Sequence, residues 1–203
     1  MPRYAHLIVG TLALAALACA QAASPITEDS PYQLGYAANM SAGDSFVNLT
    51  NSGAVGGFDP GGDICANIYV FAQDQQLVSC CSCPLTPNHL RTLSVKHDLI
   101  SNTLTPGVPT GVTIALVATQ GVATTCNASL VTTTTTGLVA WGTTIHALPD
   151  GSWGVGEVHY KAATLSGSEL QKMTTYCQFI QANGSGFGIC NPCRDGSAGA
   201  AKQ

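Results

Sequence analysis

The chain has few charged residues and no cluster of one sign. Of its 203 residues 9% are charged, with 7 Lys+Arg against 11 Asp+Glu and a net charge of −4. Soluble domains carry roughly 25% charged residues. Seven cations spread over the chain cannot form the basic surface that binds phosphate backbones, which excludes a nucleic-acid partner. Disorder is excluded too, because disordered chains are highly charged and poor in β-branched residues, whereas this one is rich in Thr, Val and Ile.

The sequence also lacks the common motifs of catalysis. It contains no phosphate-binding loop and no dinucleotide fingerprint. Gly184-Ser185-Gly186 follows a predicted helix, whereas a nucleophile elbow lies between a strand and a helix. We therefore expect a protein that is not an enzyme and has no cofactor.

Long hydrophobic runs are absent after the N-terminal segment. Arg3 precedes an uncharged apolar run from Leu7 to Ala18, and small residues suited to a signal peptidase follow near 20–23. This is the layout of a secretory signal peptide. The run is about a dozen residues, short of the roughly 20 that a transmembrane helix needs. We expect residues 1–20 to be a signal peptide and the mature protein to be secreted or at the cell surface, without a transmembrane span.

Cysteine is abundant, with nine copies. Cys19 lies in the signal segment, and the order Ala16-Leu17-Ala18 before it is wrong for a lipoprotein signal, so we expect no lipid anchor there. An even number of cysteines then remains in an exported chain, which predicts disulfides. These candidates are Cys65, Cys80, Cys81, Cys83, Cys126, Cys177, Cys190 and Cys193. A zinc site is the alternative, because Cys80–Cys83 and Cys190–Cys193 have the spacing of a zinc ribbon, but an oxidising compartment favours disulfides.

The mature chain is long enough for one domain with a sizeable core. Residues 21–43 are predicted to be an irregular N-terminal extension, 44–193 a single domain and 194–203 a flexible tail. Short β-branched runs alternate with turns, which favours an antiparallel β-sandwich of the immunoglobulin-like or jelly-roll kind. The predicted strands are 44–50, 64–71, 76–83, 93–99, 112–119, 138–148 and 153–161, with the Thr run 132–136 at a strand edge or in a loop.

One C-terminal helix is predicted over about 167–182. Ser166-Gly167-Ser168-Glu169 is a capping box, and Asn183-Gly184 is a stop signal. Leu170, Met173, Cys177 and Ile180 share one face at helical spacing, which is typical of core contact. The loop after the helix is able to bring Cys190 or Cys193 back to Cys177, so we expect the C-terminal cysteines to fasten the helix to the sheet.

Two predicted hairpins have consequences that depend on register. A loop centred on Asp74 places Cys65 opposite Cys83, at a spacing that a disulfide spans. A turn centred on Asp150-Gly151 places Trp141 opposite Tyr160. We expect a ligand face there, formed by Trp141, Trp153 and Tyr160.

The second hairpin also places His146, Glu157 and His159 on one face. His146 and His159 are four residues out of register, or about 13 Å at strand rise, so they cannot share a zinc ion. Polar residues on a solvated face are the simpler interpretation.

The Asp59-Pro60-Gly61-Gly62-Asp63 loop provides Asp59 and Asp63 as weak calcium candidates. An ordinary inter-strand turn explains the same residues, because Gly and Asp favour turns, and we expect no metal. Four glycosylation sequons begin at Asn39, Asn48, Asn127 and Asn183. They matter only in a eukaryotic secretory route.

Weak charge and the open edges of a sandwich favour association between copies. We therefore predict a secreted structural or adhesive protein, self-assembling into a filament, matrix or surface layer, with copies of itself or other surface proteins as partners. Residues 21–43 are long enough to donate a strand to a neighbour. The alternative is a monomeric extracellular module that binds carbohydrate or another surface ligand. A third possibility is an extracellular hydrolase using Glu157 or Asp150 with a histidine.

Overall fold

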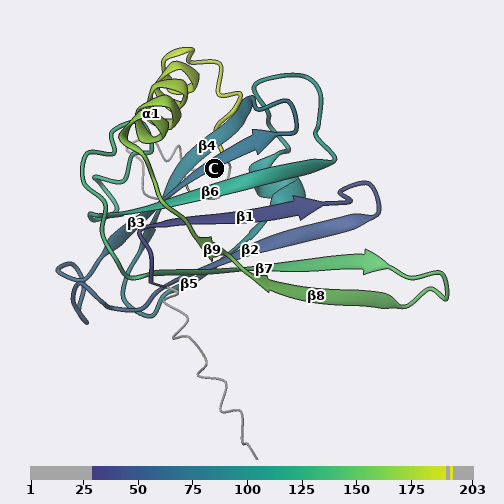
Figure 1. Cartoon of the computed structure of the whole chain (residues 1–203), viewed down its shortest axis with the longest axis horizontal. Helices are drawn as coiled ribbons and strands as arrows, with labels where there is room; N and C mark the ends of the chain where they lie inside the picture. Colours follow the sequence, from purple (N-terminus) through teal and green to yellow (C-terminus); the bar gives the residue numbers. More distant parts are fainter. Residues whose placement is uncertain (1–28, 191–192, 194–203) are drawn as a thin grey trace, which may run out of the picture.

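The computed structural model describes residues 29–190 and Cys193. Two antiparallel sheets pack face to face as a sandwich, and one C-terminal helix packs on the outer face of the larger sheet (Figure 1). The predicted class, a mainly β sandwich with one C-terminal helix and disulfides, is confirmed. The predicted signal segment, Cys19 and the tail 194–203 lie outside the described residues.

The larger sheet has the strand order β4-β3-β6-β1-β9. Its strands are β1 (Tyr32–Ala38), β3 (Ile64–Ala72), β4 (Leu77–Leu85), β6 (Gly111–Gln120) and the short β9 (Lys161–Ala162). The central strands β3 and β6 are buried on both faces along most of their length. This explains why their sequences are nearly continuous apolar runs rather than alternating ones.

The smaller sheet has the order β5-β2-β7-β8. Its strands are β2 (Gly43–Asn51), β5 (Leu90–Ser94), β7 (Leu138–Ala147) and β8 (Trp153–His159). Its inner face provides Val47, Leu49 and Leu93 to the core between the sheets. Tyr160 follows β8 at the point where the chain crosses to the larger sheet.

The helix α1 (Gly167–Ala182) matches the predicted range. The Ser166 hydroxyl accepts a hydrogen bond from the Glu169 backbone N–H at 3.1 Å, which caps the first turn. Met173, Cys177 and Ile180 are buried against the larger sheet, as the helical spacing predicted. Gly184 then takes a left-handed φ of +66°, which ends the helix.

Two parts of the predicted strand pattern are wrong. The segment 21–43 is not irregular throughout, because residues 32–38 form β1, which pairs with β6 and β9 of its own chain. The predicted strand 93–99 ends at Ser94, and a single π-helical turn, η1 (Val95–Leu99), follows. The Ser94 hydroxyl accepts from His97 N–H and the Ser94 N–H donates to the Asp98 carboxylate. These local side-chain bonds offer the backbone an alternative to the sheet ladder.

The predicted Cys65–Cys83 disulfide is also wrong. Near the turn the β3–β4 pairing follows the expected register, with Phe71 opposite Leu77, but a bulge between Val70 and Phe71 shifts the rest by one residue. Cys83 therefore lies opposite Ala66, and Cys65 opposite Pro84. Because neighbouring side chains alternate between faces, the shift puts the two cysteines on opposite sides of the sheet.

Candidate functional site

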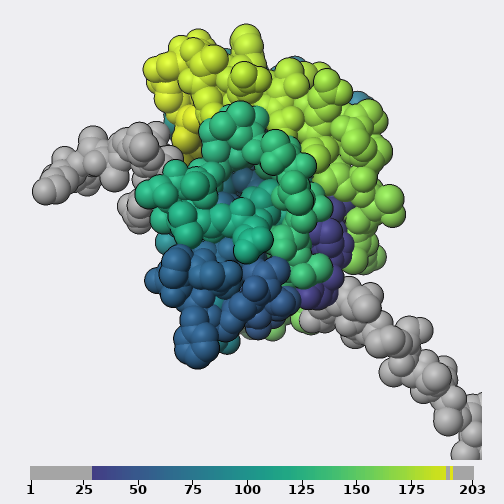
Figure 2. All heavy atoms as spheres, turned by 90° about the vertical axis from the view of Figure 1, so that its left-hand side faces the viewer, coloured from purple at the N-terminus to yellow at the C-terminus, as the bar shows by residue number. Residues whose placement is uncertain are grey.

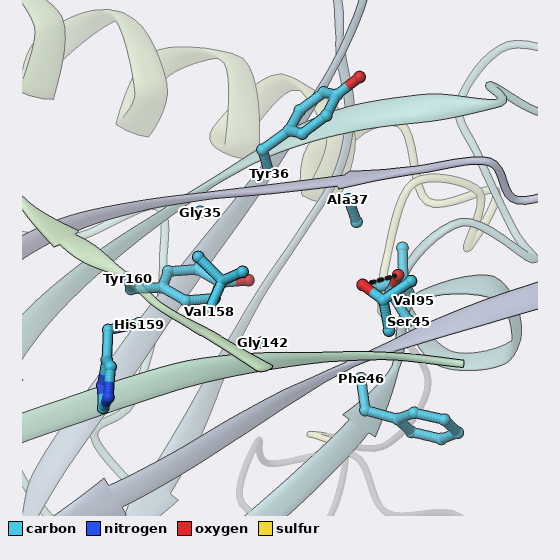
Figure 3. A pocket seen from close by; sticks show the side chains of 11 residues that line it. Gly35, Tyr36, Ala37, Ser45, Phe46, Val95, Gly142, Val158, His159 and Tyr160 are labelled. Atoms are coloured by element: carbon cyan, nitrogen blue, oxygen red, sulfur yellow. Dashed lines mark hydrogen bonds between the residues drawn. The ribbon is translucent and has the colours of Figure 1, made fainter. Parts of the chain in front are cut away.

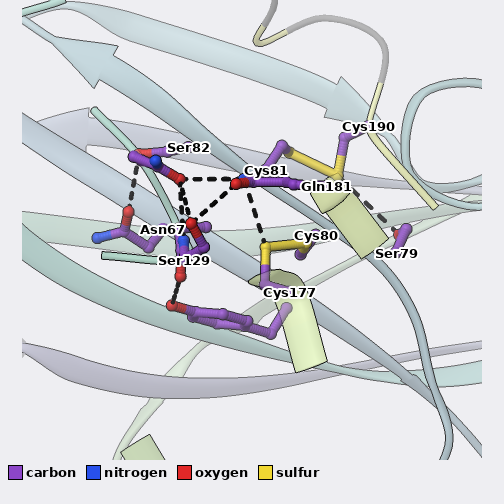
Figure 4. The surroundings of a disulfide bond; sticks show 12 residues. Asn67, Ser79, Cys80, Cys81, Ser82, Ser129, Cys177, Gln181 and Cys190 are labelled. Carbon is purple, nitrogen blue, oxygen red and sulfur yellow. Dashed lines mark hydrogen bonds between the residues drawn. A yellow bond between two sulfur atoms is a disulfide. The ribbon is translucent and has the colours of Figure 1, made fainter. Parts of the chain in front are cut away.

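All eight cysteines after Cys19 pair as disulfides, and three of the four disulfides join the edge strand β4. The pairs are Cys65–Cys126, Cys80–Cys177, Cys81–Cys190 and Cys83–Cys193. Figure 4 shows Cys80 bonded to Cys177 of α1 beside the separate Cys81–Cys190 bond. The helix is thus fastened to the sheet as expected, but the partner of Cys177 is Cys80. Four disulfides indicate an oxidising compartment.

The zinc alternative has geometric support only in part. The sulfur atoms of Cys81, Cys83 and Cys193 lie within 4.8 Å of one another and are buried. Each is engaged in a disulfide, and a zinc ligand must be a free thiolate. Cys80 of the predicted Cys80–Cys83 pair points to the helix on the other face.

The C-terminal segment also covers the edge of β4. The backbone N–H of Cys80 donates to Gly188 at 2.8 Å, and that of Cys190 donates to Cys80 at 3.3 Å. This short parallel bridge occupies hydrogen-bonding groups that an edge strand otherwise exposes. One edge of the larger sheet is therefore protected.

The second hairpin is shifted by one residue from the predicted register. Trp141 lies opposite His159 rather than Tyr160, and His146 lies opposite Gly154. The turn closes with Leu148 N–H donating to Ser152, and Asp150 accepts from the Ser152 N–H and hydroxyl. Paired residues share a face, so His146 lies on the opposite face from Glu157 and His159. The predicted three-residue polar cluster is not formed.

Tyr160 does not belong to the predicted ligand face. Its ring is buried between β1 and β7, and His159 beside it points in a different direction (Figure 3). Burial raises the pKa of the Tyr160 hydroxyl far above its ordinary value. Gly35 of β1 leaves room for the ring, because a Cβ there would lie 2.1 Å from a ring carbon. Tyr160 is a core residue.

Trp141 and Trp153 do share the outer face of the smaller sheet. The register also places Phe46, Val155 and Glu157 on this face. Trp153 and Val155 are 63% and 65% exposed. Trp141 and Trp153 are six positions apart in register, about 20 Å at strand rise. We call this surface the aromatic sheet face.

A row of polar side chains crosses the aromatic sheet face between three strands. The Thr92 hydroxyl of β5 donates to the Asn48 amide oxygen at 2.8 Å, and the Asn48 amide nitrogen donates to the Thr143 hydroxyl at 3.0 Å. Sequence reasoning missed Phe46, Asn48 and this row, although alternation in 44–50 would have assigned them to one face. Asn48 is mostly buried, so a glycan at its sequon would displace these hydrogen bonds.

The strand β8 forms the other notable feature of this sheet. It pairs with β7 alone, and among the described strands none pairs with its second edge. Six of its seven residues are exposed, and it contains no Lys, Arg or Pro. Charged side chains, above all Lys, and Pro are the usual protection of an edge strand, and Glu157 is the one acidic or basic residue (Asp, Glu, Lys or Arg) that β8 has.

The remaining predicted site residues lie apart from this face. Asp59 and Asp63 lie at one end of the sandwich, in the loop between β2 and β3, where they line a hollow with His89 and Arg91. Asp150 is fully exposed, and the hydrogen bonds that it accepts from Ser152 lower its pKa. These bonds stabilise the turn between β7 and β8. The register separates His146 from Glu157, and it leaves Glu157 and His159 two residues apart on the exposed outer face of the smaller sheet.

Among the described residues, no helix is both long and apolar enough to cross a membrane. No family model, no curated protein and no solved structure matches this chain.

Proposed function

We propose that the protein is a secreted structural or adhesive subunit whose copies associate through the edge of β8. The carrying observation is the contrast between two of the four sheet edges, those of β4 and β8. The β4 edge is covered by the C-terminal segment and fixed by three disulfides, whereas β8 is a seven-residue edge strand paired on one side only. Unpaired backbone groups on such an edge are a template for a strand of another chain.

The side chains of β8 favour the same role. Trp153, Val155 and Val158 are each more than 60% exposed, and the first two lie on the aromatic sheet face. Pairing through β8 would extend that face into a neighbouring copy and bury these groups. Burial of apolar area contributes about 25 cal/mol per Å². The net charge of −4 on 203 residues opposes the approach of copies only weakly.

This proposal changes the element that the sequence suggested for assembly. Residues 32–38 form β1, which pairs with β6 along its whole length and with β9 at Gln33 and Leu34, so this part of the segment is built into the sheet of its own chain. The second edge of β8 is unpaired among the described strands, so association through β8 does not require a strand to leave its own sheet.

Sedimentation velocity over a concentration series, without reductant, tests the proposal. We expect the mature protein to form concentration-dependent oligomers or polymers. Val155→Lys, which places a charge on β8, should shift the population to monomer. Val108→Lys is the matched control, because Val108 is 61% exposed and lies in a loop. A wild type that stays monomeric at every concentration, or equal behaviour of the two variants, would contradict the proposal.

Carbohydrate binding is the second candidate function, favoured by Trp141 and Trp153 on one exposed face beside a polar row. Sugar-binding faces stack rings on aromatic side chains and hydrogen-bond the hydroxyls. A pull-down on insoluble cellulose and chitin tests it. Retention that Trp153→Ala removes and Phe179→Ala preserves would support it, since Phe179 is an equally exposed aromatic on α1.

A further inference from the structure

The loop between β2 and β3 lies at one end of the sandwich. In Figure 2 this end faces the viewer, with the blue segment that contains the loop beside the teal segment that follows β6. The two segments are joined where the Gly121 N–H donates to the Asp63 carbonyl at 3.3 Å. Asp59 and Asp63, four positions apart in the loop, line a hollow there of about 310 Å³.

A buried asparagine fixes the conformation of this loop. The Asn51 amide nitrogen donates to the Gly62 carbonyl at 2.8 Å and to Leu85 at 2.9 Å, and its oxygen accepts from Gly53 N–H at 2.9 Å. A Cβ on Gly62 would lie 2.0 Å from the Gly56 carbonyl oxygen, so the closed loop requires glycine there. The backbone of the loop next to Asp63 is therefore held in place without any ligand.

The carboxyl group of Asp63 is incompletely satisfied by the protein. Asp63 is 5% exposed, and its Oδ1 atom is buried with no hydrogen-bond partner in the described part of the chain. A buried carboxylate oxygen without a partner costs free energy, several times more than a neutral group. This single atom points to a ligand that the described part of the chain does not itself provide.

The neighbouring Asp59 increases that need. Asp59 lines the same hollow and brings a second carboxylate to it. Two carboxylates in contact repel each other unless a proton or a cation lies between them. At neutral pH, calcium is the cation that prefers carboxylate, hydroxyl and carbonyl oxygens and accepts irregular geometry.

We propose that Asp59 and Asp63 bind one calcium ion in this hollow. The hydroxyls of Thr86 and Thr124 line the same hollow, and they, loop carbonyls and water are available as further oxygen ligands. His89 and Arg91 also line it, and the positive charge of Arg91 opposes a cation. We therefore expect the weak affinity of extracellular calcium modules, with Kd of about 10⁻⁴ to 10⁻³ M.

Calorimetric titration of the disulfide-intact mature protein with CaCl₂, after chelator treatment and at fixed ionic strength, tests the site. We expect one ion per chain and a melting temperature that rises with calcium concentration. Asp63→Asn and Asp59→Asn should each abolish both effects. Asp59 is exposed, so its variant keeps the buried side chain in place and still folds.

Asp74→Asn is the matched control, because it also removes one exposed aspartate carboxylate but lies in the turn between β3 and β4. It should bind calcium as the wild type does. The absence of heat and of any thermal shift in the wild type would overturn the proposal. Equal calcium stabilisation in Asp63→Asn and the wild type would overturn it too, since the effect would then arise elsewhere.

Discussion

Removing Cys65–Cys126 should cost more stability than removing Cys80–Cys177, although the second disulfide spans more sequence. The separations are 61 and 97 residues. A cross-link stabilises mainly by closing a loop in the unfolded chain, so the longer separation would suggest the larger effect. The connectivity reverses this order.

The reversal comes from Cys81–Cys190. This bond already ties the residue after Cys80 to the segment after α1. With it intact, breaking Cys80–Cys177 opens a ring of only about 15 residues, which is worth about 3 kcal/mol. No other disulfide shortens the loop closed by Cys65–Cys126, so its removal should cost about 4 kcal/mol.

Urea unfolding at 25 °C without reductant measures the difference between the Cys65→Ala/Cys126→Ala and Cys80→Ala/Cys177→Ala variants. A difference of about 1 kcal/mol separates the midpoints by about 0.5 M at an m-value near 2 kcal/mol/M. Peptide mapping of the three remaining disulfides is the control for reshuffling. A larger loss of stability in the Cys80→Ala/Cys177→Ala variant would refute the reasoning, because Cys81–Cys190 would then not shorten the loop that Cys80–Cys177 closes.

Two further outcomes follow from the packing and charge of single residues. Gly35→Ala should lower the free energy of unfolding by about 1–3 kcal/mol through overpacking against the buried Tyr160 ring, measured by urea unfolding. Gly156→Ala, where a Cβ meets nothing within 4 Å, should change it by less than about 0.5 kcal/mol. In calcium-free buffer the folded state holds the Asp63 proton more tightly than the unfolded state, because its pKa is raised. The free energy of unfolding should therefore fall as pH rises above about 4, and Asp63→Asn should remove that part of the slope.

The sequence by itself determined the features that arise from local contacts. The helix is the clearest case, because the Ser166 cap, the spacing of Met173, Cys177 and Ile180, and the Gly184 stop all act within a few residues. The sandwich class followed from short β-branched runs between turns. The even cysteine number predicted disulfides, and the structure pairs all eight.

Only the tertiary structure decided the registers and therefore the site. Both hairpins were predicted with the right strands, but in each the pairs that contain the predicted site residues are shifted by one residue. In the first, a bulge at Val70 separates Cys65 from Cys83. In the second, the turn at Asp150 places His146 away from Glu157. A shift of one residue costs little along the backbone yet moves each side chain to the other face.

Disulfide connectivity and edge protection were decided in the same way. Cys80 and Cys81 are adjacent in sequence, but alternation sends one to α1 and the other to the segment at Cys190. The covered β4 edge and the open β8 edge depend on where a distant C-terminal segment lies. Local sequence fixes which segments become strands or helix, because capping, turn and side-chain periodicity act over a few residues. Register, pairing and exposure depend on contacts between segments far apart in the chain, whose free energies no local pattern contains.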